Sequence, residues 1–481
     1  MTPIPSLAFL GFTAIVAILC RVCSDPRWRR GVFAAANVVF LAGFAAAPLV
    51  FVPLAGFLLA GFVCLILIQR GMVRAGWATA AFLLAIIVAF VWLKKYTFVP
   101  ADLLLPFPYL VVGLSYIFFR VLHLLIDAAQ DALPERVGLL EYIGYTLNFC
   151  SLVSGPIQRY QDYARHDPAR PAELDVIAAG SAVERIIVGF FKVDVISTVL
   201  SAAQHEALNA LTPAQSFWVR IGLGAAVVAL YPLYLYANFS GYTDFVIGAG
   251  RFLGLLLPEN FSRPFSSTNF IEFWSRWHIT LSNWLKTYVY NPLLLTLMRN
   301  LPSPRVEPWL AVAAFFVTFF LVGVWHGQTS EFLFFGVLQG GGVAINKLYQ
   351  TEMTRRLGRK RYRHLCEIPL YRMVARGLTF TWFAFTLLWF WSSWGQLNTF
   401  ASDLGAPACF ACVAVLIAAA TLALAATEAM RGYALSWTWS GQSILLSRYT
   451  RTAWGTTLAV ASIATVVLMN MKAPDIVYQA F

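Results

Sequence analysis

Two histidines, His278 and His326, stand in segments that are otherwise dominated by apolar residues. An ionisable side chain is costly in such surroundings, and inside a membrane it usually serves a function. A neutral imidazole can act as a general base near pH 7. It can also bind a metal, but no Asp, Glu or Cys stands at a ligand spacing from either histidine, so the sequence predicts no metal site. The two histidines are therefore candidate catalytic residues for proton transfer.

Other chemistry-bearing residues give weaker indications. The remaining four histidines are interpreted as packing or hydrogen-bonding residues: His123, His166, His205 and His364. Two cysteine pairs have C-x-x-C spacing, but they lack the polar surroundings and histidine partners of metal or redox sites. The sequence contains no G-x-S-x-G, Walker or H-E-x-x-H motif. The residues alone thus indicate a histidine-based site and go no further.

The first histidine lies in the segment 270–290, whose apolar residues recur three and four positions apart. Asn269 and Glu272 have the spacing of a helix capping box. The sequence therefore predicts one amphipathic helix, too polar for an ordinary span, that lies in the interface or is folded into the protein. His278 follows Trp274 by four residues, which places it on the apolar face of this helix, pointing inward.

The second histidine lies within a predicted helical hairpin over 308–347. Gly327 is suited to closing a helix that ends at His326, and Thr329 or Ser330 to capping the next one. Basic residues flank both ends of the hairpin: Arg299, Arg305, Arg355, Arg356, Arg359, Lys360 and Arg361. With both flanks in the cytoplasm, His326 is expected at the far turn, on or recessed from the external side.

The elements that position these residues belong to a membrane protein. The sequence is 59% hydrophobic and only 12% charged, whereas soluble domains carry about 25% charged residues. Its apolar blocks lack the alternation of barrel strands, so helices are expected to cross the bilayer. The blocks are Leu7–Leu19, Val32–Val50, Leu54–Ile68, Trp77–Trp92, Pro308–Trp325, Leu378–Trp391 and Leu458–Met469. We predict an all-α polytopic protein with roughly ten to twelve transmembrane helices.

The chain reads as a single membrane domain over 1–481. Gly, Pro, Asn and Arg interrupt the apolar runs of its centre, about 140–350, and hydrophobic helices at 1–109 and 370–481 flank a core of about 110–350. Broken backbone at membrane depth persists only where it is buried in protein or lines a cavity. The first apolar block precedes its basic residues, which favours a retained helix with an extracytoplasmic N-terminus over a signal peptide.

Five motifs resemble the membrane-bound O-acyltransferase family, in particular its bacterial branch of alginate O-acetylation and teichoic acid D-alanyl transfer proteins. They are SGPIQRY at 154–160, NFSGYTD at 238–244, PENFSRP at 258–264, FWSRWHITLS at 273–282 and WHG at 325–327. Their order and spacing make the resemblance specific, although the WHG triplet alone would be weak. The ending at 475–481 faintly matches an aromatic tail of the branch.

The resemblance implies a helical enzyme around a buried central tunnel, with shorter amphipathic or re-entrant helices. His326 matches the family's catalytic histidine and His278 its second motif position. The base would take a proton from an acceptor hydroxyl, which would then attack a thioester carbonyl, while His278, Arg276 or Trp277 would orient the acyl group or stabilise the oxyanion. Residues expected to line the tunnel are Trp274, Arg276, Trp277, Ser282, Asn238 and Trp325.

The resemblance also implies the reaction partners. No cofactor is expected to be bound; the acyl donor would be a cytoplasmic thioester, acetyl-CoA or an acyl carrier protein. The expected partners are the lipid bilayer and an extracytoplasmic polysaccharide, which would receive the acyl group directly or through a periplasmic acyltransferase, with no nucleic acid. The implied location is the bacterial cytoplasmic (inner) membrane. Acetyl transfer is the first expectation, D-alanyl transfer to a cell-envelope polymer the second, and a non-enzymatic transporter or channel the alternative of another class.

The chain departs from the family pattern at two positions. Family members often carry Asp where this chain has Asn238 and Thr287. Two charges expected in the central region are therefore missing, which puts any shared supporting role of these positions in doubt.

Overall fold

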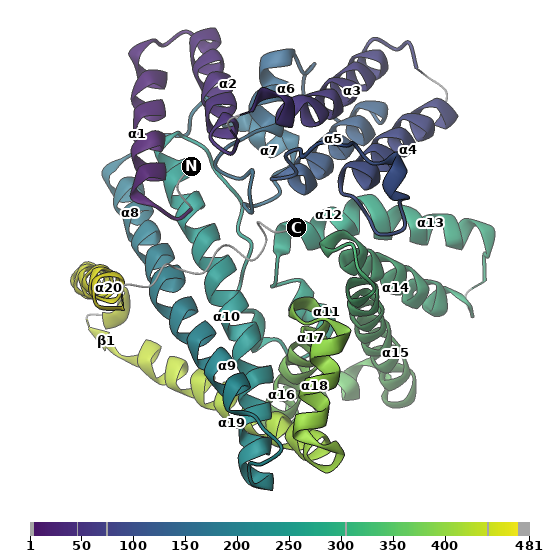
Figure 1. Cartoon of the computed structure of the whole chain (residues 1–481), viewed down its shortest axis with the longest axis vertical. Helices are drawn as coiled ribbons and strands as arrows, with labels where there is room; N and C mark the ends of the chain where they lie inside the picture. Colours follow the sequence, from purple (N-terminus) through teal and green to yellow (C-terminus); the bar gives the residue numbers. More distant parts are fainter. Residues whose placement is uncertain (1–3, 46, 74–75, 304, 440–441, 470–481) are drawn as a thin grey trace. The chain divides into compact units, whose positions relative to one another are not determined.

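The computed structural model describes residues 4–45, 47–73, 76–303, 305–439 and 442–469, and within these ranges the chain is almost entirely helical (Figure 1). The first half contains α1 (Leu7–Val22), α2 (Pro26–Ala42), α3 (Val52–Gln69), α4 (Gly76–Leu93), α5 (Leu114–Ala129), α6 (Leu139–Thr146), α7 (Tyr160–Arg165), α8 (Val176–Phe190), α9 (Thr198–Ala210) and α10 (Phe217–Phe252). The aromatic tail predicted at 475–481 lies outside the described residues.

The second half begins with short helices and ends with long ones. It contains α11 (Phe270–Trp274), α12 (Ile279–Leu285), α13 (Asn291–Asn300), α14 (Glu307–His326), α15 (Ser330–Glu367), α16 (Pro369–Thr386), α17 (Leu388–Trp391), α18 (Trp394–Leu404), α19 (Ala406–Ser436) and α20 (Arg448–Met469). The 3₁₀ turns are η1 (Pro48–Phe51), η2 (Ala101–Leu103), η4 (Pro264–Ser266) and η6 (Ile444–Leu446), and the π-helical turns are η3 (Phe191–Ser197) and η5 (Lys286–Tyr290). Strands β1 (Thr438–Trp439) and β2 (Gln442–Ser443) form one antiparallel ladder.

The all-α membrane class is confirmed. Seven helical stretches of the described chain are long and apolar enough to cross a bilayer: Pro48–Gln69, Gly76–Leu93, Val176–Ala210, Phe217–Phe252, Glu307–His326, Pro369–Trp391 and Ala406–Ser436. This is fewer than the ten to twelve expected. The difference arises because apolar blocks do not always form one long helix: the first gives the 16-residue α1, and the second is divided when α2 ends at Ala42.

The described residues fall into two compact units. The first takes its residues from 1–193 and 239–259, and the second takes them from 194–238 and 260–474. The helical run of α8, η3 and α9 and the long helix α10 each pass from one unit to the other along the chain. Both candidate histidines belong to the second unit. The tunnel that the resemblance implies stays a prediction.

In the first unit, glycines bring α8 and α10 into close contact. A Cβ added to Gly189 would lie 2.7 Å from the Gly241 carbonyl oxygen, and one added to Gly248 would lie 2.8 Å from the Ala182 carbonyl oxygen. Small residues of this kind allow membrane helices to approach closely. The Asp244 carboxylate then binds Lys192 at 2.6 Å on the same helix pair. The NFSGYTD motif therefore has a packing and ion-pairing role in this unit.

His123 is a buried hydrogen-bonding residue of the first unit, which confirms its interpretation from the sequence. The Tyr160 backbone N–H donates to its Nε2 at 2.9 Å, and its Nδ1 lies 3.6 Å from an Asp127 carboxylate oxygen. Because Nε2 accepts a backbone proton, this imidazole anchors the start of α7.

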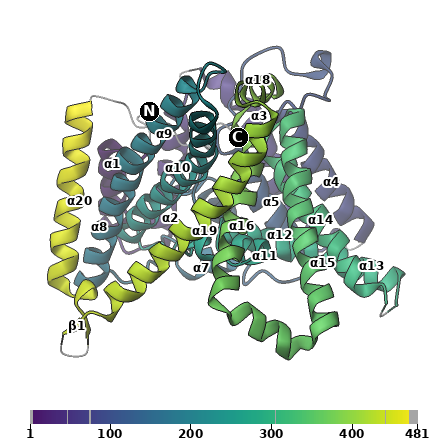
Figure 2. The same cartoon turned by 90° about the horizontal axis from the view of Figure 1, so that it is seen from below.

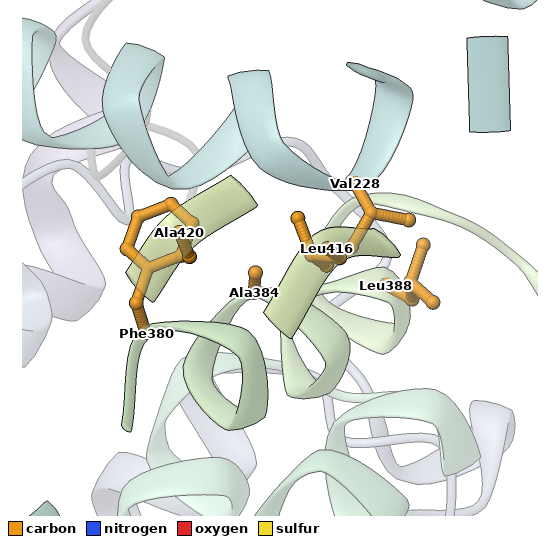
Figure 3. Packing of buried hydrophobic residues seen from close by; sticks show 6 residues of the cluster. All are labelled: Val228, Phe380, Ala384, Leu388, Leu416 and Ala420. Carbon is orange, nitrogen blue, oxygen red and sulfur yellow. The ribbon is translucent and has the colours of Figure 1, made fainter. Parts of the chain in front are cut away.

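In the second unit, a buried apolar cluster joins α10, α16, α17 and α19. Figure 3 shows its members from all four helices: Val228, Phe380, Ala384, Leu388, Leu416 and Ala420. Burying apolar side chains contributes about 25 cal/mol for each Å² removed from water, but between lipid-embedded helices packing itself supplies much of the stability. This cluster fixes α17, which carries a residue of the candidate site.

Candidate active site

The ring of Trp325 brings the two candidate histidines together. Its centroid lies 6.4 Å from that of His278 in an edge-to-face arrangement and 4.5 Å from that of its neighbour His326. His278 is 1% exposed and His326 is 2% exposed. Residues nearly fifty positions apart in the sequence therefore meet at one buried indole. The prediction that His278 points inward is confirmed, and Trp325 lies beside both histidine rings.

His326 is the last residue of α14, where the predicted hairpin turns. A Cβ added to Gly323 would lie 2.3 Å from the Gly336 Cα, and one added to Gly340 would lie 2.5 Å from the Phe316 carbonyl oxygen. These three glycines let α14 and α15 pack backbone against backbone, as small residues do in membrane helix pairs. The hairpin is thus held rigidly up to the turn that carries His326.

The turn lies where the sequence predicts it, but Gly327 does not close the helix in the predicted way. The helix ends at His326, and Thr329 is the N-cap of α15. Gly327, however, has extended backbone (φ −160°) instead of the left-handed conformation of a typical capping glycine. A Cβ at this position would lie 1.9 Å from the Phe332 ring. Glycine is required here because the aromatic ring occupies the space of a side chain.

Aromatic rings enclose His326 on two further sides. Its ring centroid lies 5.0 Å from that of Phe390 in α17 and 5.9 Å from that of Phe335 in α15, both edge to face. The sequence did not identify either phenylalanine, since nothing distinguishes them from the many other apolar residues of these helices. The imidazole is therefore buried among aromatic rings, where charges interact more strongly than they do in water.

His278 does not lie in one continuous amphipathic helix, and that prediction is wrong. The segment is divided into α11, α12 and the π-turn η5, and His278 sits in the break before α12 with left-handed backbone, φ 45° and ψ 54°. A non-glycine residue in this conformation stores strain and is often found at functional sites. The helical spacing therefore predicted the burial of His278 correctly, although this residue does not lie in a helix.

The break at His278 is held open by the neighbouring segment 257–263. The Asn260 carbonyl accepts the Ile279 N–H at 2.9 Å, and Asn260 Oδ1 accepts the Thr280 hydroxyl at 2.6 Å. Two residues after Asn260, the Ser262 N–H donates to the Arg276 carbonyl at 3.0 Å. These bonds replace the helical bonds that the segment loses, so PENFSRP positions His278 without touching the reacting groups.

Replacing Asn260 with alanine is expected to release this turn. The substitution leaves the buried Thr280 hydroxyl without its 2.6 Å acceptor, at a cost of about 1–3 kcal/mol in the free energy of unfolding. The double variant Asn260→Ala/Thr280→Val serves as the control, because it removes the hydroxyl donor together with its acceptor and leaves no buried hydroxyl unpaired. The unfolding temperature should fall further in the single alanine variant than in the double variant; equal behaviour of the two would contradict this role.

A second polar chain crosses the unit beside the histidines. The Trp274 Nε1–H donates to Gln339 Oε1 at 3.3 Å, and Gln339 Nε2–H donates to the Thr386 hydroxyl at 2.8 Å. This chain links α11, α15 and α16 through a glutamine with no exposed surface. Trp274 was predicted from its motif, whereas Gln339 and Thr386 were missed. The signal available was a single amide within the otherwise apolar and glycine-rich start of α15.

The other predicted residues lie at different distances from the histidines. Trp277 packs among Phe273, Phe383 and neighbouring rings, where its centroid is 4.9 Å from that of Phe383. Arg276 is tied to Glu272 at 2.7 Å, at the edge of the unit. Asn238 is fully buried in α10, and Ser282 donates weakly to the Trp277 carbonyl. The ring contacts therefore bring together His278, His326 and Trp325, whereas Trp274 and Trp277 pack against other residues.

The capping prediction at the start of α11 is confirmed in part. Asn269 is the N-cap, and its side chain accepts the Glu272 N–H at 2.9 Å. The Glu272 carboxylate, however, accepts the N–H of Thr268 at 2.9 Å and binds Arg276. The carboxylate thus stabilises both ends of the short helix that leads to His278.

Burial determines the charge state of His278. Its complete removal from solvent lowers the pKa of the imidazole to about 3, because an apolar environment disfavours the charged form. At neutral pH the side chain is therefore an uncharged imidazole, able to donate one hydrogen bond and accept another.

Comparison with known proteins agrees with these features. The model of the membrane-bound O-acyltransferase family, MBOAT, matches residues 78–390. The chain is 32% identical over 257 residues to a Pseudomonas fluorescens protein named "probable alginate O-acetylase AlgI", covering 52% of this chain and 46% of that protein. It is 29% identical over 232 residues to the teichoic acid D-alanyltransferase of Bacillus subtilis, covering 47% and 56%.

The chain spans about half the length of the curated relatives it matches. The matched family region includes both histidines, Trp325 and all the helices that enclose them. This chain belongs to the membrane-bound O-acyltransferase family.

Proposed function

We propose that this chain transfers an acyl group from a thioester donor to hydroxyls of an extracytoplasmic polysaccharide. The observation that carries the proposal is the meeting of His278 and His326 at the buried Trp325 ring, inside the matched family region. The names of the relatives, an alginate O-acetylase and a teichoic acid D-alanyltransferase, support acyl transfer to a polymer of the cell envelope.

The proposed reaction assigns His326 the role of general base. Its neutral imidazole takes the proton from an acceptor hydroxyl, and the oxygen attacks the carbonyl carbon of the thioester. The tetrahedral intermediate collapses as the C–S bond breaks, and the imidazolium returns the proton to the departing thiolate. One ester is formed and one thiol is released, so the histidine ends each cycle neutral. The dry surroundings formed by Phe335 and Phe390 exclude water from competing with the acceptor.

His278 is proposed to position the acyl group from the other side of Trp325. Because burial lowers its pKa to about 3, it acts as a neutral hydrogen-bonding group and not as a cationic acid. A neutral N–H directed at a developing oxyanion still stabilises the transition state more than the ground state. Arg276 is less suited to this role, since Glu272 and Ser266 already bind its guanidinium.

The acyl group is proposed to be acetyl, with D-alanyl as the alternative that the teichoic acid relatives support. The donor would be acetyl-CoA or an acyl carrier protein, reached from the cytoplasm, and the acyl group would pass to the polymer directly or through a periplasmic acyltransferase. The proposed location is the bacterial inner membrane, with the N-terminus and the α14–α15 turn on the extracytoplasmic side. The basic end of α15 would then face the cytoplasm.

Mass spectrometry of cell-surface glycans tests the proposed function. Cells that express the chain should carry acetyl esters, seen as alkali-labile increments of one acetyl group, and cells without it should lack them. D-alanine in place of acetyl would establish the alternative. Identical ester content in the two strains, with the protein present in the membrane, would contradict acyl transfer altogether.

A further inference from the structure

A cavity separate from the histidine site opens between α15 and α16. It has a volume of about 480 Å³, within the usual range of small-molecule sites. Its walls combine apolar side chains with three tyrosines, and the residues that matter here are Phe270, Ile345, Tyr349, Tyr362, Tyr371 and Trp382. The Tyr349 and Tyr371 hydroxyls lie 3.3 Å apart. The tyrosine hydroxyls gather at one end of the cavity, and the other end, at Phe270 and Trp382, is mainly apolar, although Asn269, Asn346 and Thr379 also line the cavity.

The length of the cavity matches one leaflet of a bilayer. It follows α16, a candidate membrane span, from Tyr371 to Trp382. Eleven residues of helix rise about 16 Å at about 1.5 Å per residue, close to half of a hydrocarbon core about 30 Å thick. Tyr371 stands near the start of the candidate span Pro369–Trp391 and Trp382 near its middle. A bilayer crossed by this span would place the tyrosine end at the depth of lipid headgroups, where aromatic residues with a polar group are enriched.

A basic segment stands beside the tyrosine end. Gly358, with φ 76°, interrupts α15, and the helix resumes over Arg359–Glu367. This short helical segment leads directly into α16 (Figure 2). Arg359 and Arg363 lie within one turn of Tyr362, on the same face of this short helix. The carboxylate of Glu367 forms an ion pair with Arg363. Among the described residues, Arg359, Lys360 and Arg361 form no ion pair. An exposed cluster of positive charge therefore remains at the headgroup end.

The apolar end continues into a second cavity of about 660 Å³. The two share Leu378 and Trp382, and the second is bounded by α18 and α19. Trp382 lines both cavities. It packs closely against Gly342, where an added Cβ would lie 2.2 Å from the Trp382 Nε1. Thr381 also lines the second cavity; it is 6% exposed, and its hydroxyl has no hydrogen-bond partner among the described atoms. The two adjoining cavities therefore suit a ligand with a polar headgroup and a long acyl chain.

We propose that the first cavity binds an anionic phospholipid of the surrounding bilayer. Its phosphate is held by the segment Arg359–Arg363, its ester region lies against the tyrosine hydroxyls, and one acyl chain follows α16 to Trp382. Clusters of basic residues next to a membrane helix attract anionic lipids. The cavity adds a defined binding site for one acyl chain of the lipid. The acyl chain of a zwitterionic lipid would fit the cavity equally well, but its headgroup would not neutralise the basic segment.

Native mass spectrometry of the full-length protein tests this site. The protein is released from nanodiscs of phosphatidylcholine with one third phosphatidylglycerol, and the lipids that stay bound are identified. The variant R359Q/K360Q/R361Q should retain phosphatidylglycerol about 10- to 100-fold less than the wild type. The matched control R27Q/R299Q/R305Q removes the same charge from other exposed positions and should retain it fully.

Cys366, which lines the cavity, gives a second measurement. Phosphatidylglycerol should slow its modification by a maleimide at least several-fold relative to pure phosphatidylcholine, while modification of Cys20 stays unchanged. Equal lipid retention by the two triple variants would overturn the proposal. Protection of Cys366 by acetyl-CoA instead of phosphatidylglycerol would also overturn it, by assigning the cavity to an acyl donor.

Discussion

Replacing His326 with alanine is expected to lower the rate of acyl transfer by about 100- to 10,000-fold, the range that a general base contributes. The hydroxyl of an acceptor then has no group to take its proton as it attacks the thioester. The side chain lies in a pocket formed by Trp325, Phe335 and Phe390, so water replaces the imidazole poorly. Ester content of the surface polymer and transfer by the purified protein both measure this loss.

Two further variants separate chemistry from folding. His326→Gln fills most of the same space and should be as inactive as the alanine variant, because an amide is not a base. His364→Ala removes an exposed histidine near the end of α15 and should leave transfer unchanged. Membrane level and thermal unfolding should be close to wild type for the glutamine variant. Substantial transfer by either variant at position 326 would show that another group removes the proton.

Replacing Gly323 with alanine is expected to damage the same site without touching either histidine. The added Cβ would lie 2.3 Å from the Gly336 Cα and 2.5 Å from the Phe332 carbonyl oxygen, and backbone atoms cannot move aside as side chains do. Overpacking of this kind costs about 1–3 kcal/mol, occasionally more. We expect a lower unfolding temperature and a loss of transfer of at least about tenfold, because displacement of reacting groups by about 1 Å can cost about 100-fold.

Gly341 supplies the matched control for this prediction. It lies in α15, the helix against which Gly323 packs, and nothing lies within 4 Å of a Cβ at this position. Gly341→Ala should therefore be neutral or should stabilise the helix by up to about 1 kcal/mol. Similar unfolding temperatures and activities for the two alanine variants would contradict close backbone packing as the reason for glycine at position 323.

Much of the fold could be predicted from the sequence where apolar runs were long. The hairpin over 308–347 is present as α14 and α15, with its turn at His326 as expected. The number of spans was less well predicted, because a helix can end inside an apolar block, as α2 does at Ala42 within the block Val32–Val50. Composition reports the length of an apolar run, whereas the helix boundary depends on backbone bonds that composition does not describe.

The site was predictable in its residues but not in its construction. The histidines, Trp325 and Trp274 were identified from apolar context and motif resemblance. The break at His278 was not, because it depends on bonds from Asn260 to residues 279 and 280, and helical spacing assumes that no such partner exists. Phe390 was missed because it lies in α17, which only tertiary packing brings to His326. Gln339 was missed because its partner Trp274 is distant in the sequence.

The central claim, acyl transfer by this chain with His326 as the base, is tested most directly with purified protein in nanodiscs. Acetyl-CoA and an oligosaccharide acceptor are added, and the released thiol and the new acetyl ester are measured in the same samples. The proposed reaction predicts equal amounts of thiol and ester from the wild type and neither from the His326→Gln variant. Ester formation by that variant at the wild-type rate would contradict the claim.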